Sequence, residues 1–396
     1  MGARQRRAAL RACESVADPR LVSLLVGLLA DPAVRVRAAN ALAAIGAPAL
    51  EPLLSLMTSA ETPRDVRLLV PRVLRRIPSQ ETYQRLMTQA DVAESHLRLR
   101  VLGALSRLRQ VLKRPPEPIE RVRALLRSEL ERGYRNLAGW DAARMRFETP
   151  LLSEEMDFRH TRAIRRILRI LELRYSPEPL RLVRERIEDA SRRANALEVL
   201  DTMLEPTLRP MVMQFFDDLS PRELVKKADS LAPKAAPTAE DFMREEAAHP
   251  NPYITLVVLD ALARHGDALA VELGEAAASR PEALAREGAV FALASGPPQR
   301  VRGLLSQLSK DRDPVVARHA QIELARLGGQ PPEVPMHSTV EKVLFLKSAP
   351  LFAKVTGEDL APLAHVAEEQ TYAPGAAIFQ QGEPGTDVFV IHEGSF

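Results

Sequence analysis

The densest group of side chains that could bind a metal ion lies near the middle of the chain. Glu154, Glu155, Asp157 and His160 offer oxygen and nitrogen ligands within one short stretch. Zinc sites draw their ligands from characteristic convergent spacings, and this stretch has none of them. We interpret Ser153 instead as the N-cap of a helix whose first turn is acidic, because the helix macrodipole favours negative charge there. The sequence therefore predicts no metal site.

The common sequence signatures of catalysis are missing as well. The eight histidines form no HxH, HExxH or HxxxH pair, and no GxSxG sequence occurs. The single cysteine, Cys13, lies in an arginine-rich stretch, where we interpret it as a small packing residue. Gly328-Gly329 and Gly382–Gly385 lack the lysine of a phosphate-binding loop. We therefore predict no catalytic residues and a protein that is not an enzyme.

Arginine supplies most of the positive charge on the predicted helices. One stripe lies opposite an apolar helix side and consists of Arg159, Arg162, Arg165, Arg166 and Arg169. Earlier segments add Arg72, Arg75, Arg76, Arg98, Arg100, Arg107 and Arg109. These stripes either bind nucleic acid phosphates or form solvated helix faces paired with Glu172, Glu178, Glu185 and Glu188. We favour solvated faces and expect no nucleic acid, since the net charge is only +3.

Aromatic residues make up only 4% of the chain, yet several gather in one region. Tyr134, Trp140, Phe147 and Phe158 lie within it. Such a group is either a partner-binding patch or a local core plug, and we favour the plug because large aromatic side chains are usually buried.

The bulk composition is typical of a globular cytoplasmic protein. The 396 residues are 46% hydrophobic and 27% charged, which is enough to bury a core. A single cysteine rules out an intramolecular disulfide framework. No apolar run approaches the roughly 20 residues of a membrane span, and the basic start lacks the apolar region of a signal peptide.

Helical hairpins are the elements that must position these side chains. Asp18-Pro19 and Asp31-Pro32 each place a capping carboxylate before a proline, a typical helix start. Apolar residues follow at helical spacing, for example over Leu21–Ala30, and Gly46 ends the second segment. Two short amphipathic helices joined this tightly need neighbouring pairs to cover their remaining apolar sides, which is the logic of an α-solenoid.

The segment Asp31–Gly46 resembles a HEAT repeat. A second copy at Asp313–Gly328 keeps the cap, the apolar spacing and the glycine, but has Ala317 where the first has Arg35. Weaker copies are Leu97–Leu108, Ala194–Leu204, Val257–Gly266 and Ala289–Gly296. The resemblance implies a mainly α fold of the HEAT or armadillo type. We expect HEAT-like repeats at 1–110, an irregular helical region at 111–247, further repeats at 248–329 and a linker at 330–339.

The stretch Tyr372–Gly394 alone has the pattern of β structure. Ala377–Phe379 and Val388–Ile391 suit short strands, and the bend between them is rich in glycine and proline. With Leu351-Phe352 and the helix at Leu360–Ala364, residues 340–396 resemble the opening of a cyclic nucleotide-binding domain. The matching signature positions are Gly375, Ile378, Gly382, Glu383, Gly385, Phe389, Ile391 and Gly394.

This second resemblance implies the first strands of a β jelly roll. The arginine and glutamate that hold the cyclic nucleotide in that family would lie beyond Phe396, so this chain has no cofactor-binding residue and Gly375, Gly382, Glu383, Gly385 and Gly394 are structural. A longer parent is expected to bind cAMP or cGMP.

Three functions fit these patterns. The leading hypothesis is a non-enzymatic scaffold that presents its helical repeats to a protein partner and carries part of a cyclic-nucleotide sensor. The second is the soluble part of a membrane protein resembling nucleotide transporters, which apolar 20-residue segments upstream of Met1 would support. The third is a HEAT-like nucleic-acid-binding protein or enzyme, for which salt-dependent DNA binding would be the evidence.

Overall fold

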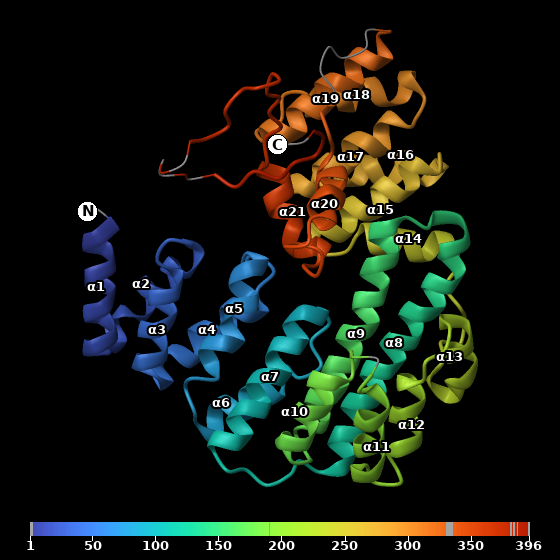
Figure 1. Ribbon diagram of the computed structural model, residues 1–396. Helices are drawn as coiled ribbons and strands as arrows, with labels where there is room; N and C mark the ends of the chain where they lie inside the picture. The colour runs from blue at the N-terminus through green and yellow to red at the C-terminus, as the bar shows by residue number, and fades with distance from the viewer. Residues whose placement is uncertain are drawn as a thin grey trace. The chain divides into compact units, whose positions relative to one another are not determined.

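The computed structural model describes residues 3–189, 191–329, 336–380, 382, 385 and 387–394. These residues form a mainly helical chain with helices α1 to α21, short 3-10 turns and no β-strand among them (Figure 1). The chain divides into two compact units. Unit 1 comprises residues 1–137 and 159–234, and unit 2 comprises residues 138–158 and 235–396.

The first helices of unit 1 follow one another as short pairs. They are α1 (Ala3–Val16), α2 (Val22–Gly27), α3 (Arg35–Ile45), α4 (Leu50–Thr58), α5 (Arg64–Leu74), α6 (Gln80–Met87) and α7 (Ser95–Val111). Consecutive members pack together, since α4 contacts α5 and α6 contacts α7, while α5 also packs against α7. Each pair therefore covers part of the apolar side of the next.

Two long helices belong to both units. Helix α8 (Ile119–Phe147) and helix α9 (Pro150–Leu171) each cross from one unit's residues into the other's. The rest of unit 1 consists of α10 (Pro177–Arg186), α11 (Arg193–Met203), α12 (Arg209–Met213), the 3-10 turn Gln214–Phe216 and α13 (Pro221–Lys227). Both long helices lie within the region 111–247 that the sequence indicated to be helical but irregular.

Unit 2 begins a second series of helices. They are α14 (Ala239–Ala247), α15 (Pro252–Arg264), α16 (Ala268–Ala277), α17 (Ala283–Ala294), α18 (Pro298–Leu308) and α19 (Pro314–Leu327), followed by α20 (Thr339–Ser348) and α21 (Gly357–Val366). Helix α17 packs against α15, α16, α18 and α19, and α20 packs against α21. None of the helices in the described residues is long and apolar enough to cross a membrane.

Several predicted helix starts are confirmed by their caps. The Asp313 carboxylate accepts hydrogen bonds from the backbone of Val315 and Val316, and the Asp18 carboxylate accepts one from the Arg20 amide. Such caps satisfy backbone donors that the first helical turn leaves unpaired. At Asp31 the carboxylate binds the Ala33 amide, but the chain makes a turn before helix α3 begins.

Two predicted helices differ from their expected bounds. The prediction for Ser153 was wrong, because α9 already begins at Pro150 and the Ser153 hydroxyl donates to Glu148. The segment Leu21–Ala30 is not one helix, because α2 is only its central part and lies between two 3-10 turns. Apolar spacing alone does not distinguish these tighter turns from an α-helix.

An arginine recurs at the start of the second helix of several pairs, and we call this contact the arginine joint. Its guanidinium donates a hydrogen bond to the backbone carbonyl six residues earlier. The pairs are Arg35 to Leu29 at 2.7 Å, Arg98 to Val92 at 2.5 Å and Arg286 to Arg280 at 2.9 Å. The same arginines form ion pairs with carboxylates later in the chain. Arg35 pairs with Asp65 at 2.6 Å, Arg98 with Glu129 at 2.8 Å and Arg286 with Asp311 at 2.7 Å. The arginine joint thus connects the carbonyl that precedes its own helix with a carboxylate of the following helical pair. Among the described residues, Arg193 makes only the carbonyl contacts, to Ile187 and Phe216.

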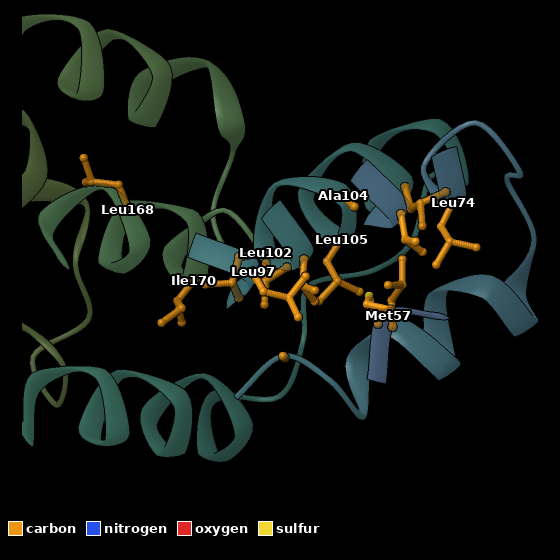
Figure 2. Packing of buried hydrophobic residues seen from close by; sticks show 14 of the residues in the cluster. Met57, Leu74, Leu97, Leu102, Ala104, Leu105, Leu168 and Ile170 are labelled. Carbon is orange, nitrogen blue, oxygen red and sulfur yellow. The ribbon is translucent and has the colours of Figure 1, made fainter. Parts of the chain in front are cut away.

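The cores are aliphatic, as the composition indicates. Figure 2 shows part of the core of unit 1, where Met57, Leu74 and Leu105 come from α4, α5 and α7 and are fully buried or nearly so. The core of unit 2 includes Val257 and Leu259 of α15 and also Val343 and Leu360 of α20 and α21. Helices α20 and α21 therefore share a core with the preceding helices.

The predicted strands of the jelly roll are not seen. Residues 377–379 and 388–391 form no strand among the described residues, and Phe379 and Val388 remain 65% and 80% exposed. Isolated strands are unstable without neighbours that pair their edges and cover one face. The described part of this stretch supplies neither, and strand propensity alone does not compensate.

Candidate anion-binding surface

Four exposed arginines lie on two adjacent helices of unit 1, and we call them the arginine face. They are Arg72 and Arg75 at the end of α5 and Arg100 and Arg107 on α7. Because α5 packs against α7, the two rows are neighbours. Arg100 and Arg107 are seven residues apart, which is about two helical turns and places them on one side of α7.

The guanidinium groups of the arginine face meet no acidic partner among the described residues. No hydrogen bond or ion pair joins any of the four to another side chain in the part of the chain that the structure describes. Partial burial lowers the pKa of Arg75, and the positive charges of Arg72, Arg107 and Arg100 lower it further. These like charges are therefore close enough to repel one another, a cost that a bound anion would remove.

Helix α9 adds a fifth arginine at the edge of this surface. The Nε atom of Arg169 lies 3.9 Å from the point where a Cβ atom on Gly103 would stand, so Arg169 reaches α7 beside Gly103. Arg169 donates to Glu172 at 2.7 Å. The buried Glu172 carboxylate also accepts from Ser106 and Arg184, so it is not available to the arginine face.

Several other arginines of the predicted stripes are paired within the chain. Arg98 and Arg166 are buried and both bind Glu129, at 2.8 Å each. Arg109 donates to three carbonyl oxygens just after the end of α9, those of Glu172, Arg174 and Tyr175. As predicted, Arg165 is paired on the surface, with Glu188. Sequence spacing did not separate these paired arginines from the four of the arginine face.

The remaining predicted groups form no second site. No group of three or more metal-binding side chains occurs among residues 3–189, 191–329 and the other described positions. Glu154 pairs with Lys347 at 2.7 Å. Burial lowers the pKa of His160 to about 4, and its ring packs against Phe215.

The aromatic residues are mostly core residues. Tyr134, Trp140 and Phe147 are buried, as the plug interpretation predicted. They do not form one cluster, because Tyr134 belongs to the core of unit 1 and the other two to the core of unit 2. Their apolar surface is therefore not a partner-binding patch.

Three of the signature glycines adopt backbone angles that favour glycine. Gly375, Gly382 and Gly394 have backbone φ angles of 81°, 95° and 109°, in the left-handed region that favours glycine. Gly385 is described without a positive φ angle, and Glu383 lies outside the described residues. The turn chemistry was predictable, although the strands expected on either side are not seen in the described residues.

The architecture and this surface define an all-helical protein built largely of paired helices, with an exposed basic surface. No family model matches the chain, and no curated protein matches it. One solved structure with some similarity is described as the crystal structure of an engineered protein from the Northeast Structural Genomics Consortium. It shares 17% sequence identity and a TM-score of 0.22, over 84% of this chain and 97% of that chain. A similarity this low does not indicate a shared fold.

Proposed function

We propose that this protein is a non-enzymatic helical-repeat scaffold that binds an acidic segment of a protein partner on the arginine face. The observation that carries the proposal is the set of four guanidinium groups on α5 and α7 that have no acidic partner among the described residues. Guanidinium groups bind carboxylates through two parallel hydrogen bonds. The arginine joint supports the repeat architecture, because it recurs at Arg35, Arg98 and Arg286.

We favour a protein segment over nucleic acid as the ligand of the arginine face. The reason is that, in unit 2, another helix of the chain lies near the equivalent side of the repeat helix α19. Arg100 lies two positions after the joint residue Arg98, and His319 lies two positions after Ala317, which replaces the joint arginine in α19. His365 of α21 reaches the Asp313 cap at the start of α19 and the buried Glu287 of α17, and Glu287 lies 3.6 Å from His319. The chain thus already places a helical segment on this side of its repeats.

The test is binding of a fluorescent oligoglutamate peptide to the full chain, measured by anisotropy. The double variant Arg75→Ala, Arg107→Ala should weaken binding by roughly tenfold or more for each arginine, since a hydrogen bond between charged groups contributes about 1.5–3 kcal/mol. The control variant Arg123→Ala, Arg127→Ala removes two exposed charges from α8 of the same unit, and should bind like the wild type.

Three results would refute this proposal. The first is no binding of the peptide, and the second is an equal loss of affinity in both double variants. The third is a DNA duplex that binds more tightly than the peptide and depends on Arg75 and Arg107. This last result would favour nucleic acid, with a steep dependence of affinity on salt.

The regulatory part of the proposal is the module at residues 340–396. Its support is the sequence resemblance and the left-handed backbone angles at Gly375, Gly382 and Gly394. A version of the protein extended beyond residue 396 should be stabilised by cAMP or cGMP, by about 2.7 kcal/mol at a hundredfold excess over Kd. Equal thermal stability with and without both nucleotides would remove this part and leave the scaffold proposal intact.

A further inference from the structure

A buried polar cluster lies beneath helices α20 and α21 in unit 2. Its centre is Glu287 on α17, whose side chain is fully buried. The backbone amide and the hydroxyl of Thr339, at the start of α20, donate to the two Glu287 carboxylate oxygens at 2.7 and 2.6 Å. The first residue of α20 is therefore held by one carboxylate.

His365 on α21 bridges two carboxylates in this cluster. Its Nδ1 atom lies 2.9 Å from the Glu287 carboxylate, and its Nε2 atom lies 3.2 Å from each oxygen of Asp313. Asp313 is also the N-cap of α19. A neutral imidazole carries only one N–H, so both contacts are hydrogen bonds only when His365 is protonated.

The charges around the cluster favour the protonated imidazole. Burial lowers the pKa of His365, but the hydrogen bonds and charges of Glu287 and Asp313 raise it by more, so it lies above the ordinary value. His319 has its pKa lowered mainly by burial. Other charged groups facing the cluster are Glu341 and Lys342 on α20 and Asp260 with Arg264 on α15.

We propose that the α20–α21 pair is a pH-dependent latch, docked on α17 and α19 by the His365 imidazolium between Glu287 and Asp313 and loosened when His365 loses its proton. A histidine whose pKa is raised by docking stabilises the docked state fully below the undocked pKa of about 6.5. That stabilisation is lost as the pH rises through the docked pKa. The latch uses none of the residues of the arginine face.

Hydrogen exchange of the full chain tests the latch. Protection of the amides in α20, corrected for the intrinsic rate at each pH, is compared between about pH 6 and about pH 9, a window that starts near the ordinary histidine pKa. In the wild type, protection should fall by roughly tenfold for each unit by which docking raises that pKa. Amides of α3 in unit 1 should keep their protection.

Variants separate the latch from a general loss of stability. His365→Gln keeps one hydrogen-bonding group without the charge, and its α20 protection should be low already at the lower pH and change little with pH. Glu287→Gln should behave in the same way. The control is His265→Gln, an exposed histidine of the same unit, which should keep the wild-type pH dependence.

The wild-type measurement decides the matter even if a variant fails to fold. Equal corrected protection of α20 at both pH values would overturn the proposal. So would a His365→Gln variant whose protection still falls with pH as it does in the wild type.

Discussion

Gly357, the first residue of α21, allows the α20–α21 pair to pack closely on α15. A Cβ atom at this position would stand 1.9 Å from the Tyr253 hydroxyl oxygen and 2.7 Å from its Cζ atom. Tyr253 is only 2% exposed, so its ring is enclosed by the core and would have to displace its neighbours or the helix. Overpacking of this kind costs about 1–3 kcal/mol. We predict that Gly357→Ala destabilises unit 2 by about 2 kcal/mol.

Gly303 is a matched control in the same unit. It lies on α18, is exposed, and has no atom within 4 Å of the point where a Cβ atom would stand. Alanine is favoured over glycine in a helix interior by about 0.8–1 kcal/mol, so Gly303→Ala should stabilise the protein. The same substitution is thus expected to have opposite signs at the two sites.

A double-mutant cycle assigns the cost at Gly357 to Tyr253. Tyr253→Phe removes the closest atom but leaves Cζ, so it should recover part of the loss, with a coupling of about 1 kcal/mol. The assay is urea denaturation followed by circular dichroism, supported by hydrogen exchange of α15 and α21 amides. If Gly357→Ala were as stable as Gly303→Ala, α21 would not pack on α15 as described.

Three further predictions follow from other contacts. Glu129→Ala should lower the free energy of unfolding by about 3–5 kcal/mol, because it leaves Arg98 and Arg166 buried without a carboxylate partner. The control Glu131→Ala breaks an exposed pair and should change the free energy of unfolding by about 0.5 kcal/mol or less. Arg75→Ala should leave the urea midpoint unchanged or raise it, because it relieves repulsion by neighbouring arginines, and a clear fall would contradict the arginine face. His160 should titrate near a pKa of about 4 by NMR. The stability of the protein should fall as the pH drops from about 6.5 towards that value, because the unfolded chain takes up the proton first. A titration near 6.5 would show that the ring is not buried.

The sequence predicted helices well where local residues decide the structure. Asp313 and Asp18 cap the helical turns they were expected to cap, because an N-cap involves only the next few residues. The β prediction at 377–391 was wrong for the opposite reason. Strand stability depends on edge pairing and burial by distant segments, which the local sequence does not contain.

The candidate site was only partly predictable. The arginines were recognised, but their roles depend on partners far along the chain, since Arg98 meets Glu129 31 residues away. The junction at His365 was missed entirely, because Glu287 lies 78 residues earlier. The available signal in the sequence was Glu287, an acidic residue beside the repeat arginine Arg286 in an otherwise apolar segment.

The crossing of α8 and α9 between the units has a consequence for biosynthesis. Residues 138–158 leave the ribosome early, yet the rest of their unit starts only at residue 235. At about 5–20 residues per second, translation of the intervening segment takes roughly 4–15 s. During that interval Trp140, Phe147 and Leu152, which are buried in the finished protein, have no partners from the later part of their own unit. The nascent chain is therefore expected to depend on chaperones more than a protein whose domains are contiguous in sequence.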